Sequence, residues 1–327
     1  MNRPEPGLDK DQIERVVAAA TRAPSLLNCQ PWRFVAGADR IDVFAVPERG
    51  PASVDPTGRE RFLSLGAAVL NLRLAIAALG LAPAVHLMPS AEDRTHVARV
   101  SIGGRQRQGE LEGPLSDAIE KRQCSRVPFT DELVRDEEFL HLQDAAAAEG
   151  AWLDVATGIH RTLVLDVLHE ADLIQRADPR LVNDFAAWTT TRANPALGIP
   201  PQSLGPRPHS PGAAVRDMTL GSDGKVAGRG VAEFEGRGML AVLLTTGDAA
   251  VDWVRGGMAL ERVLLTATVL GLSTGILSHG TEVVDLRPLV RDPSSRWRHP
   301  QVVVRFGHGD AMPATPRLPV SEVLELR

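Results

Sequence analysis

The spacing of apolar residues along the chain predicts helices and strands in mixed order. The clearest helical stretch runs from 57 to 79. Its apolar positions recur at steps of three and four residues: Phe62, Leu65, Val69, Leu72, Ile76 and Leu79. We expect a capping box over 57–60 (Thr-Gly-Arg-Glu) to begin this helix and Gly80 to end it.

The same pattern returns 191 residues later. The matching positions, in register, are Gly66 with Gly257, Ala68 with Ala259, Leu74 with Leu265, and Leu79-Gly80-Leu81 with Leu270-Gly271-Leu272. Each copy is followed by a β-like run that ends in glycine, at 97–104 and 302–309. Two core helices can look alike by chance, but identity at both glycines favours an internal duplication.

The remaining periodicities complete an α+β chain rather than a regular βαβ winding. We expect a helix over 9–21, a strand pair over 33–46, helices over 115–123, 136–149 and 160–192, and a strand over 239–246. The polar, glycine-rich stretch 103–114 reads as a junction between two halves, 1–112 and 113–327. The proline- and glycine-rich stretch 194–230, with the residues following it to about 235, is predicted to be an insertion that forms a lid.

Composition narrows the class of protein. The net charge is −5 and the pI near 6.0, which argues against a nucleic-acid partner. The chain has no tyrosine, so a tyrosine acid is excluded, and its two cysteines form neither a disulfide framework nor a zinc site. No metal-ligand pattern is present. The first residues lack an apolar signal core, and Asn71 and Arg73 interrupt the most apolar helix, so we expect a cytoplasmic protein without a membrane span.

The loop RAPSLLNCQPWRF (22–34) follows the first helix and is unusually rich in prolines and amides. Ser25, Asn28 and Gln30 could hydrogen-bond the edge of a planar heteroaromatic ligand, while Pro24 and Pro31 would fix the backbone beforehand. The same residues could instead form a structural turn in which Asn28 caps local amides. The loop by itself does not decide between these two interpretations.

Two arginine-bearing stretches could bind phosphate. In KRQCSRVPF (121–129), at the end of a predicted helix, Arg122 and Arg126 are four residues apart and Ser125 adds a hydroxyl. In ATPRLP (314–319), Arg317 is held between two prolines. By itself the first stretch is better explained as a solvated helix end. For the second stretch, the alternative is a tail that merely packs on the surface.

Taken together, these stretches resemble a known family. APSLLNCQPWRF is similar to the flavin-facing loop of nitroreductase-fold proteins, and RQCSR, GLSTGILS (271–278) and PRLP are similar to the other three pieces of the same FMN site. The order of these pieces, the doubled architecture and the insertion resemble the Acg family, in which two nitroreductase-like halves are fused in one chain. The resemblance covers nearly the whole sequence.

The resemblance implies one FMN site per chain, because the loop occurs only in the first half and the arginines only in the second. The residues it implies are Arg122 and Arg317 for the phosphate, Arg126 for the pyrimidine, Pro24, Ser25 and Asn28 for the ring and ribityl chain, and Leu277 and Ser278 near N5. Cys124 stands where the family usually has a hydroxyl, which weakens that donor.

Two functions follow from the resemblance. In the first, NAD(P)H reduces bound FMN, which then reduces a small-molecule electron acceptor, a nitroaromatic or quinone. In the second, the chain stores or sequesters FMN, because a closed lid would keep nicotinamide away from the ring. Fusion satisfies the usual dimer interface internally, which favours a monomer and leaves a homodimer open.

Overall fold

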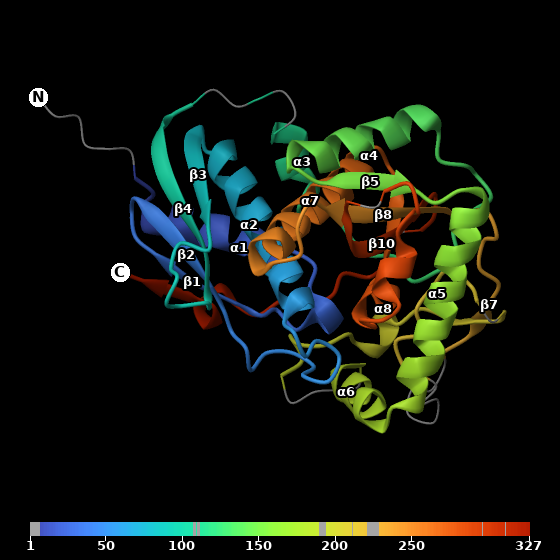
Figure 1. Ribbon diagram of the computed structural model, residues 1–327. Helices are drawn as coiled ribbons and strands as arrows, with labels where there is room; N and C mark the ends of the chain where they lie inside the picture. Colours follow the sequence, from blue (N-terminus) through green and yellow to red (C-terminus); the bar gives the residue numbers. More distant parts are fainter. Residues whose placement is uncertain are drawn as a thin grey trace, which may run out of the picture.

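Two β-sheets flank a pair of long helices in the computed structural model of the chain (Figure 1). The structure describes residues 7–106, 109, 112–189, 194–210, 212–220, 229–295, 297–310 and 312–327. The central helices are α2 (Arg59–Ala78) and α7 (Ala250–Val269), which pack against each other more extensively than any other two helices. These are the two helices in which the sequence shows its repeat.

The first sheet covers one side of this pair. Its strands are β1 (Trp32–Ala36), β2 (Arg40–Ala45), β3 (Leu81–Leu87), β4 (His96–Arg105) and β11 (Leu324–Leu326), in the order β11-β1-β2-β4-β3. Helices α1 (Lys10–Thr21) and α2 share a hydrophobic core with this sheet. The edge strand β11 comes from the C-terminus and runs parallel to β1, with Leu324 opposite Phe34. The end of the chain therefore returns to the first half.

The second sheet has the order β5-β8-β10-β9 and is antiparallel throughout. Its strands are β5 (Trp152–Val155), β8 (Met239–Thr245), β9 (Ser273–Leu277) and β10 (His299–Gly307). On β8, Ala241 and Leu243 face α7 and α4 (Asp136–Ala148), whereas Val242 and Leu244 face α5 (Gly158–Ala177). Burial on both faces explains why β8 reads as a continuous apolar run rather than an alternating one.

The crossing of α2 and α7 uses glycine on both helices. A Cβ on Gly66 would lie 2.9 Å from Met258 N and closer still to Val254 O. A Cβ on Gly257 would lie 2.7 Å from the carbonyl carbon of Leu63 and closer still to its oxygen. The contacts are reciprocal, because Leu63 and Val254 are separated by the same 191 positions as Gly66 and Gly257. A two-fold interface between like copies has this property, and it supports the predicted duplication.

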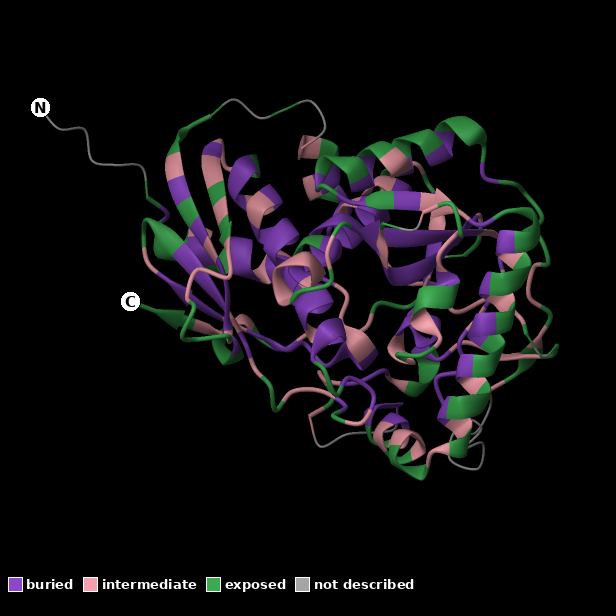
Figure 2. Ribbon diagram, in the orientation of Figure 1, coloured by how far each residue is buried: buried purple, intermediate pink, exposed green. Residues whose placement is uncertain are grey.

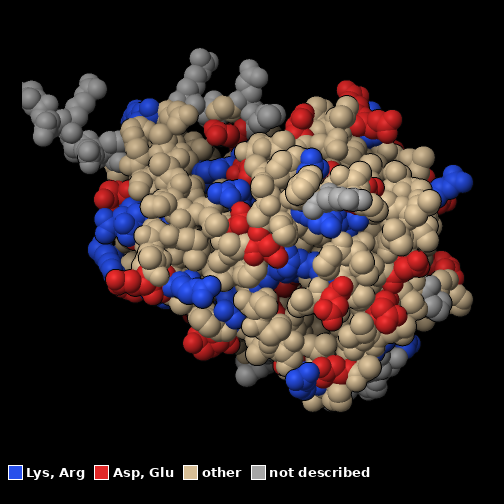
Figure 3. All heavy atoms as spheres, viewed as in Figure 1, with Lys and Arg blue, Asp and Glu red and all other residues tan. Residues whose placement is uncertain are grey.

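Helix α2 is long and apolar enough to cross a membrane by length and composition, but most of it is buried inside the protein. Figure 2 shows it buried along most of its length, between the first sheet and α7. Its hydrophobicity therefore reflects its position in the core. On the face shown in Figure 3, acidic and basic side chains are interspersed.

Several helix boundaries differ from the sequence prediction. The capping box at 57–60 is wrong: α2 begins at Arg59 after Gly58 with φ 77°, and the Asp55 carboxylate accepts the N–H groups of Glu60 (3.1 Å) and Arg61 (2.9 Å). The other end is confirmed, because Gly80 has φ 76°, and Gly271 repeats this after α7 with φ 77°. Only glycine adopts this conformation without strain.

The helix predicted over 160–192 is two helices. α5 ends at Ala177, and α6 (Pro179–Thr189) begins directly after Asp178, whose backbone is extended (φ −96°, ψ 109°). A residue before proline avoids the helical region, so the break has a local cause; residues 190–192 lie outside the described residues. The helix predicted over 115–123 is observed as α3 (Glu112–Ala118), so Arg122 and Arg126 lie beyond it.

The helices near 9–21 and 136–149 and the strands near 33–46, 97–104, 239–246 and 302–309 are confirmed to within a few residues. The insertion carries little regular structure. Its described elements are a 3₁₀ turn at Pro201–Ser203 and the short strands β6 (Arg207–Pro208) and β7 (Val231–Ala232). Elsewhere in the chain, the short helices are 3₁₀ turns at Leu26–Asn28, Arg287–Val290 and Val320–Glu322, and α8 (His279–Glu282).

Candidate functional site

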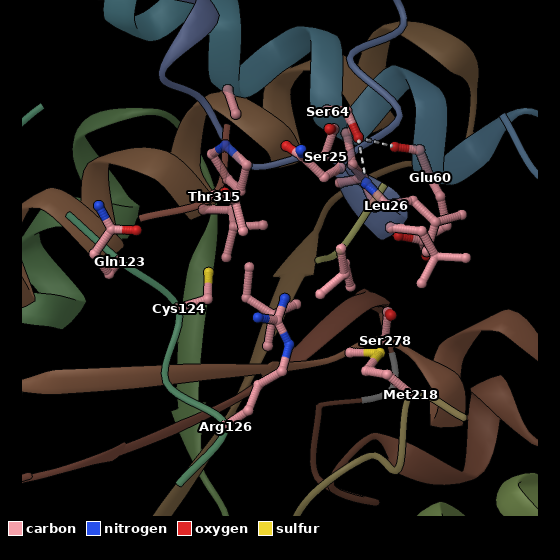
Figure 4. Close-up of a pocket in the computed structure, with 18 of the residues that line it drawn as sticks. Ser25, Leu26, Glu60, Ser64, Gln123, Cys124, Arg126, Met218, Ser278 and Thr315 are labelled. Atoms are coloured by element: carbon pink, nitrogen blue, oxygen red, sulfur yellow. Dashed lines mark hydrogen bonds between the residues drawn. The ribbon is translucent and has the colours of Figure 1, made fainter. Parts of the chain in front are cut away.

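A cavity lies where the two halves meet, with an empty volume of about 1030 Å³ including its solvent-open part (Figure 4). It brings together, from distant parts of the sequence, the predicted residues Pro24, Ser25, Asn28, Arg122, Cys124, Ser125, Arg126, Ser278 and Arg317. Gln30 and Leu277, which were also predicted, are not among its lining residues.

The loop after α1 holds a strained backbone beside the cavity. Leu27, Asn28 and Gln30 all have positive φ, at 48°, 55° and 51°. Residues other than glycine rarely adopt this conformation, and they keep it where surrounding contacts fix it. Ser25 supplies one such contact, because its hydroxyl accepts the N–H of Gln30 at 3.0 Å. This hydrogen bond fixes the Ser25 hydroxyl and the backbone of the loop in place before any ligand binds.

The two amides of this loop bind protein groups. Asn28 donates to the carbonyl oxygens of Gly198 (3.0 Å) and Pro316 (3.1 Å) and accepts from Arg317 (3.0 Å). Gln30 is fully buried; it donates to the Ala196 carbonyl (2.6 Å) and accepts the N–H of Leu318 (2.8 Å). The expectation that Gln30 reads a ligand edge is therefore not supported, because its amide joins the loop to the insertion and to the C-terminal segment.

Arg122 and Arg317 converge at one end of the cavity. Each donates a 3.0 Å hydrogen bond to the same carbonyl oxygen, that of Arg22, so their guanidiniums are neighbours. Arg317 is oriented further by the Thr21 carbonyl (2.7 Å) and the Thr315 hydroxyl (2.7 Å). Arg122 is buried, and its Nε has no hydrogen-bond partner among the described residues. Two adjacent guanidiniums lining a cavity favour an anion between them.

The electrostatics of this end agree with that geometry. Burial, followed by the repulsion of Arg122 and Arg22, lowers the pKa of Arg317 to about 9. The acid nearest to the pair is Glu261 on α7, whose carboxylate lies 3.3 Å from Arg122 Nε. Burial raises the pKa of Glu261 to about 7 against the attraction of Arg122. Among the described residues, one buried acid thus faces these two arginines, and this end of the cavity has an excess of positive charge.

Arg126 projects into the middle of the cavity, with Cys124 on one side and Met218 and Ser278 on the other (Figure 4). Its guanidinium donates to the Ser203 carbonyl at 3.0 Å. Just before it in the sequence, Cys124 forms an isolated parallel bridge with Thr274 of β9, and the N–H of Ser125 donates to the Thr274 carbonyl at 2.6 Å. Arg122 lies in the turn that follows α3, where its N–H donates to the Ala118 carbonyl at 2.9 Å, and Arg126 lies beyond the bridge. The two arginines therefore reach the cavity from different parts of the backbone and not from one helix face.

The insertion closes the opposite end. Ile199, Arg216 and Met218 from it line the cavity. Arg216 is buried and donates to Glu282 through two bonds of 2.7 Å and to the Ser278 hydroxyl at 3.1 Å. A buried, bidentate arginine pair holds a segment more firmly than surface contacts do, so Arg216 fastens the insertion over the cavity. Sequence reasoning found the insertion but missed this residue.

Glu60 and Ser64, on the first turns of α2, also line the cavity and were missed. Glu60 pairs with Arg59, and burial raises its pKa to about 8 despite that pair. Glu261 was missed as well, although the repeat gives a signal for it. In the alignment of the two copies Glu261 corresponds to Leu70, so a charged residue occupies a position that is expected to be apolar. Cys29 is buried in an apolar cluster away from the cavity lining, and burial raises the pKa of its thiol to about 12.

The second half lacks the equivalent loop. In the first half, residues 22–31 connect α1 to β1. In the second half, the corresponding connection from α4 to β5 consists of residues 149–151 alone. Glu149, one of these three residues, lies beside α2 and α7, where Arg73 and Arg262 both bind its carboxylate. These arginines are thus already neutralised by the protein itself, in contrast to Arg122 and Arg317.

Comparison with known proteins finds a matching family model, similar sequences and similar solved structures. A model described as the nitroreductase family matches residues 3–43. Across 99% of its length the chain is 31% identical to "Putative NAD(P)H nitroreductase acg" of Mycobacterium tuberculosis strain H37Rv, covering 98% of that protein. It is 27% identical to "Putative NAD(P)H nitroreductase Rv3131" of the same strain, with 97% and 92% covered. Among solved structures, the FMN-dependent nitroreductase NfnB of Mycobacterium smegmatis, in complex with NADPH, matches with a TM-score of 0.40 and 15% identity, over 65% of this chain and 97% of that chain.

Proposed function

Since the chain belongs to the Acg family of nitroreductase-like proteins, we propose that it is an FMN-dependent oxidoreductase that takes electrons from NAD(P)H. The observation that carries the proposal is the pair Arg122 and Arg317, whose guanidiniums meet at one end of the cavity with insufficient negative charge to balance them. A phosphate ester with a charge of about −2 suits this end.

The residues present fit FMN along the rest of the cavity as well. Arg122 and Arg317 would hold the phosphate, and the loop 22–31 would lie against the flavin, with its strained backbone fixed beforehand by Ser25 and by the anchored Gln30. Arg126 would place a cation beside the ring, where it stabilises an anionic reduced flavin. Bound FMN would supply hydride transfer, and the protein's part is to orient it and exclude water.

The acceptor class we propose is a nitroaromatic or quinone. Apolar cavity residues such as Leu63, Leu260 and Ile276 suit a planar aromatic compound. The first test is spectroscopic. The purified chain should bind one equivalent of FMN, and anaerobic NADPH or NADH should bleach its flavin absorbance, with colour returning when a quinone or nitroaromatic is added. A chain that takes up no FMN would overturn the proposal.

FMN storage is a second candidate, favoured by the fastening of the insertion. Arg216 is 3% exposed and forms its pair with Glu282 inside the protein, while Met218 and Ile199 occupy space above the cavity. A nicotinamide could stack on the flavin only if this segment moved. If the protein stores FMN, dithionite should bleach the flavin, whereas NADPH and NADH should not. Arg216→Ala should then restore reactivity of the flavin toward nicotinamides. Prompt bleaching of the unmodified chain would rule storage out.

A further inference from the structure

We propose that Glu261 takes up a proton when the FMN phosphate binds, so that the chain selects FMN over riboflavin most strongly at and below neutral pH. The inference rests on the proposed FMN site and concerns one residue that this site does not otherwise use. Glu261 does not line the cavity; it would act through Arg122, as a positioning residue.

The geometry places Glu261 directly behind the phosphate end of the cavity. Its side chain is fully buried on α7, 3.3 Å from Nε of Arg122, which lines the cavity. The contact is an ion pair without an aligned hydrogen bond: both carboxylate oxygens and Arg122 Nε have no hydrogen-bond partner among the described residues. The amide of Asn71, on α2, lies beside the carboxylate but is not aligned to donate to it. A buried carboxylate so weakly satisfied is easily protonated.

Counting charges gives the direction of the effect. Two guanidiniums, Arg122 and Arg317, and one carboxylate leave a net charge of about +1 before ligand binding, and a phosphate dianion changes this to about −1. Protonation of Glu261 restores neutrality. Two further cations lie nearby, Arg22, which lies 3.5 Å from Glu120, and Arg126, whose charge acts on Arg122. The charges that act on Glu261 itself are those of Arg122 and Arg317, so the count is made for these groups. In a buried site, neutralising one carboxylate costs less than keeping an unbalanced charge.

The pKa of Glu261 makes the proton uptake observable at ordinary pH. Burial already raises it to about 7 in the free protein, and an adjacent phosphate raises it further. Binding an anion that raises a pKa takes up protons, so affinity for FMN should fall as pH rises above about 7, by up to tenfold per pH unit. Riboflavin carries no phosphate, so its affinity should not change over the same range.

The experiment is calorimetric titration of the chain with FMN and with riboflavin at pH 7.5, in two buffers that differ in ionisation enthalpy. At that pH the free phosphate is already mostly dianionic, since its second pKa is about 6. We expect uptake of most of one proton per FMN bound and none per riboflavin. In Glu261→Gln, the amide imitates the protonated acid, so at pH 7.5 FMN should bind without proton uptake. Its affinity should be nearly independent of pH from about 7 to 8, between the pKa of the free phosphate, about 6, and the pKa of Arg317, about 9.

Glu132→Gln, which alters an exposed acid, serves as the matched control and should behave as the unmodified chain. Proton uptake that persists in Glu261→Gln, or equal uptake with riboflavin, would overturn the inference while leaving the FMN site intact. Should FMN fail to bind any of the three proteins, the proposed function fails with it. The comparison of FMN with riboflavin needs no variant, so it decides the matter even if Glu261→Gln does not fold.

Discussion

The crossing of α2 and α7 makes a quantitative prediction about Gly257→Ala. In an exposed helix this change would stabilise the protein by about 1 kcal/mol, because alanine restricts the unfolded chain more than glycine does. Here the new methyl would lie 2.7 Å from the carbonyl carbon of Leu63, whereas carbon atoms pack favourably at about 3.5–4.0 Å. The obstructing atoms belong to backbone, so no side chain can rotate away.

The helices must therefore separate by roughly 1 Å, which forfeits about a quarter to a half of the dispersion energy at each contact between them. Overpacking of this kind costs about 1–3 kcal/mol or more, so the loss exceeds the helix-propensity gain. We expect Gly257→Ala to lower the free energy of unfolding by about 1–2 kcal/mol. Gly66→Ala should cost as much by the reciprocal contact, and the double variant should cost less than the sum, because one separation relieves both clashes.

Urea unfolding followed by circular dichroism measures these differences through the midpoint at unchanged slope. Gly104→Ala is the control, because nothing lies within 4 Å of its Cβ position; its unfolding free energy should change by less than about 0.5 kcal/mol. A Gly257→Ala variant as stable as the unmodified chain would refute the reasoning, and strictly additive losses would refute the shared-interface explanation.

Three further predictions concern the cavity. Arg122→Ala should weaken FMN binding about 10- to 150-fold in a fluorescence titration, since a charge-assisted bond contributes about 1.5–3 kcal/mol, whereas the exposed control Arg135→Ala should bind as the unmodified chain does. Arg216→Ala should release FMN faster in stopped-flow displacement, because the insertion loses its buried pair with the second half; an unchanged rate would mean that the insertion does not retain the flavin. In the native protein, iodoacetamide should modify Cys124 and spare Cys29, whose thiol pKa burial raises to about 12, and FMN should protect Cys124; mass spectrometry showing equal labelling of both thiols would contradict this.

The α+β, nitroreductase-like fold class was predictable from the sequence and is confirmed, because long amphipathic stretches and terminating glycines such as Gly80 are local signals. Short strands were not. β5 has four residues and β11 has three, which is too short for a periodic pattern to show. β11 forms by pairing with β1, which is nearly the whole chain away in the sequence, so no local signal predicts it. The break at Asp178 was missed although Pro179 signals it, because the apolar periodicity continues on both sides.

The candidate site shows a similar limit. Arg122 and Arg126 were identified from an assumed helix face, yet they reach the cavity from the turn after α3 and from the segment beyond it, so the residue types were informative where the local structure was wrong. Gln30 was chosen for its amide, and tertiary contacts with Ala196 and Leu318 use that amide instead. Arg216 carried no signal, since its role depends on a partner, Glu282, brought near it only by folding.

The division into halves at 112 and the existence of a single working site stay predictions, and one structure tests both most directly. We would determine the crystal structure of the chain with FMN. The account predicts one flavin per chain, with its phosphate between the guanidiniums of Arg122 and Arg317 and its ring beside Arg126. A flavin bound elsewhere, a phosphate facing away from this pair, or a second flavin beside Glu149 would contradict it.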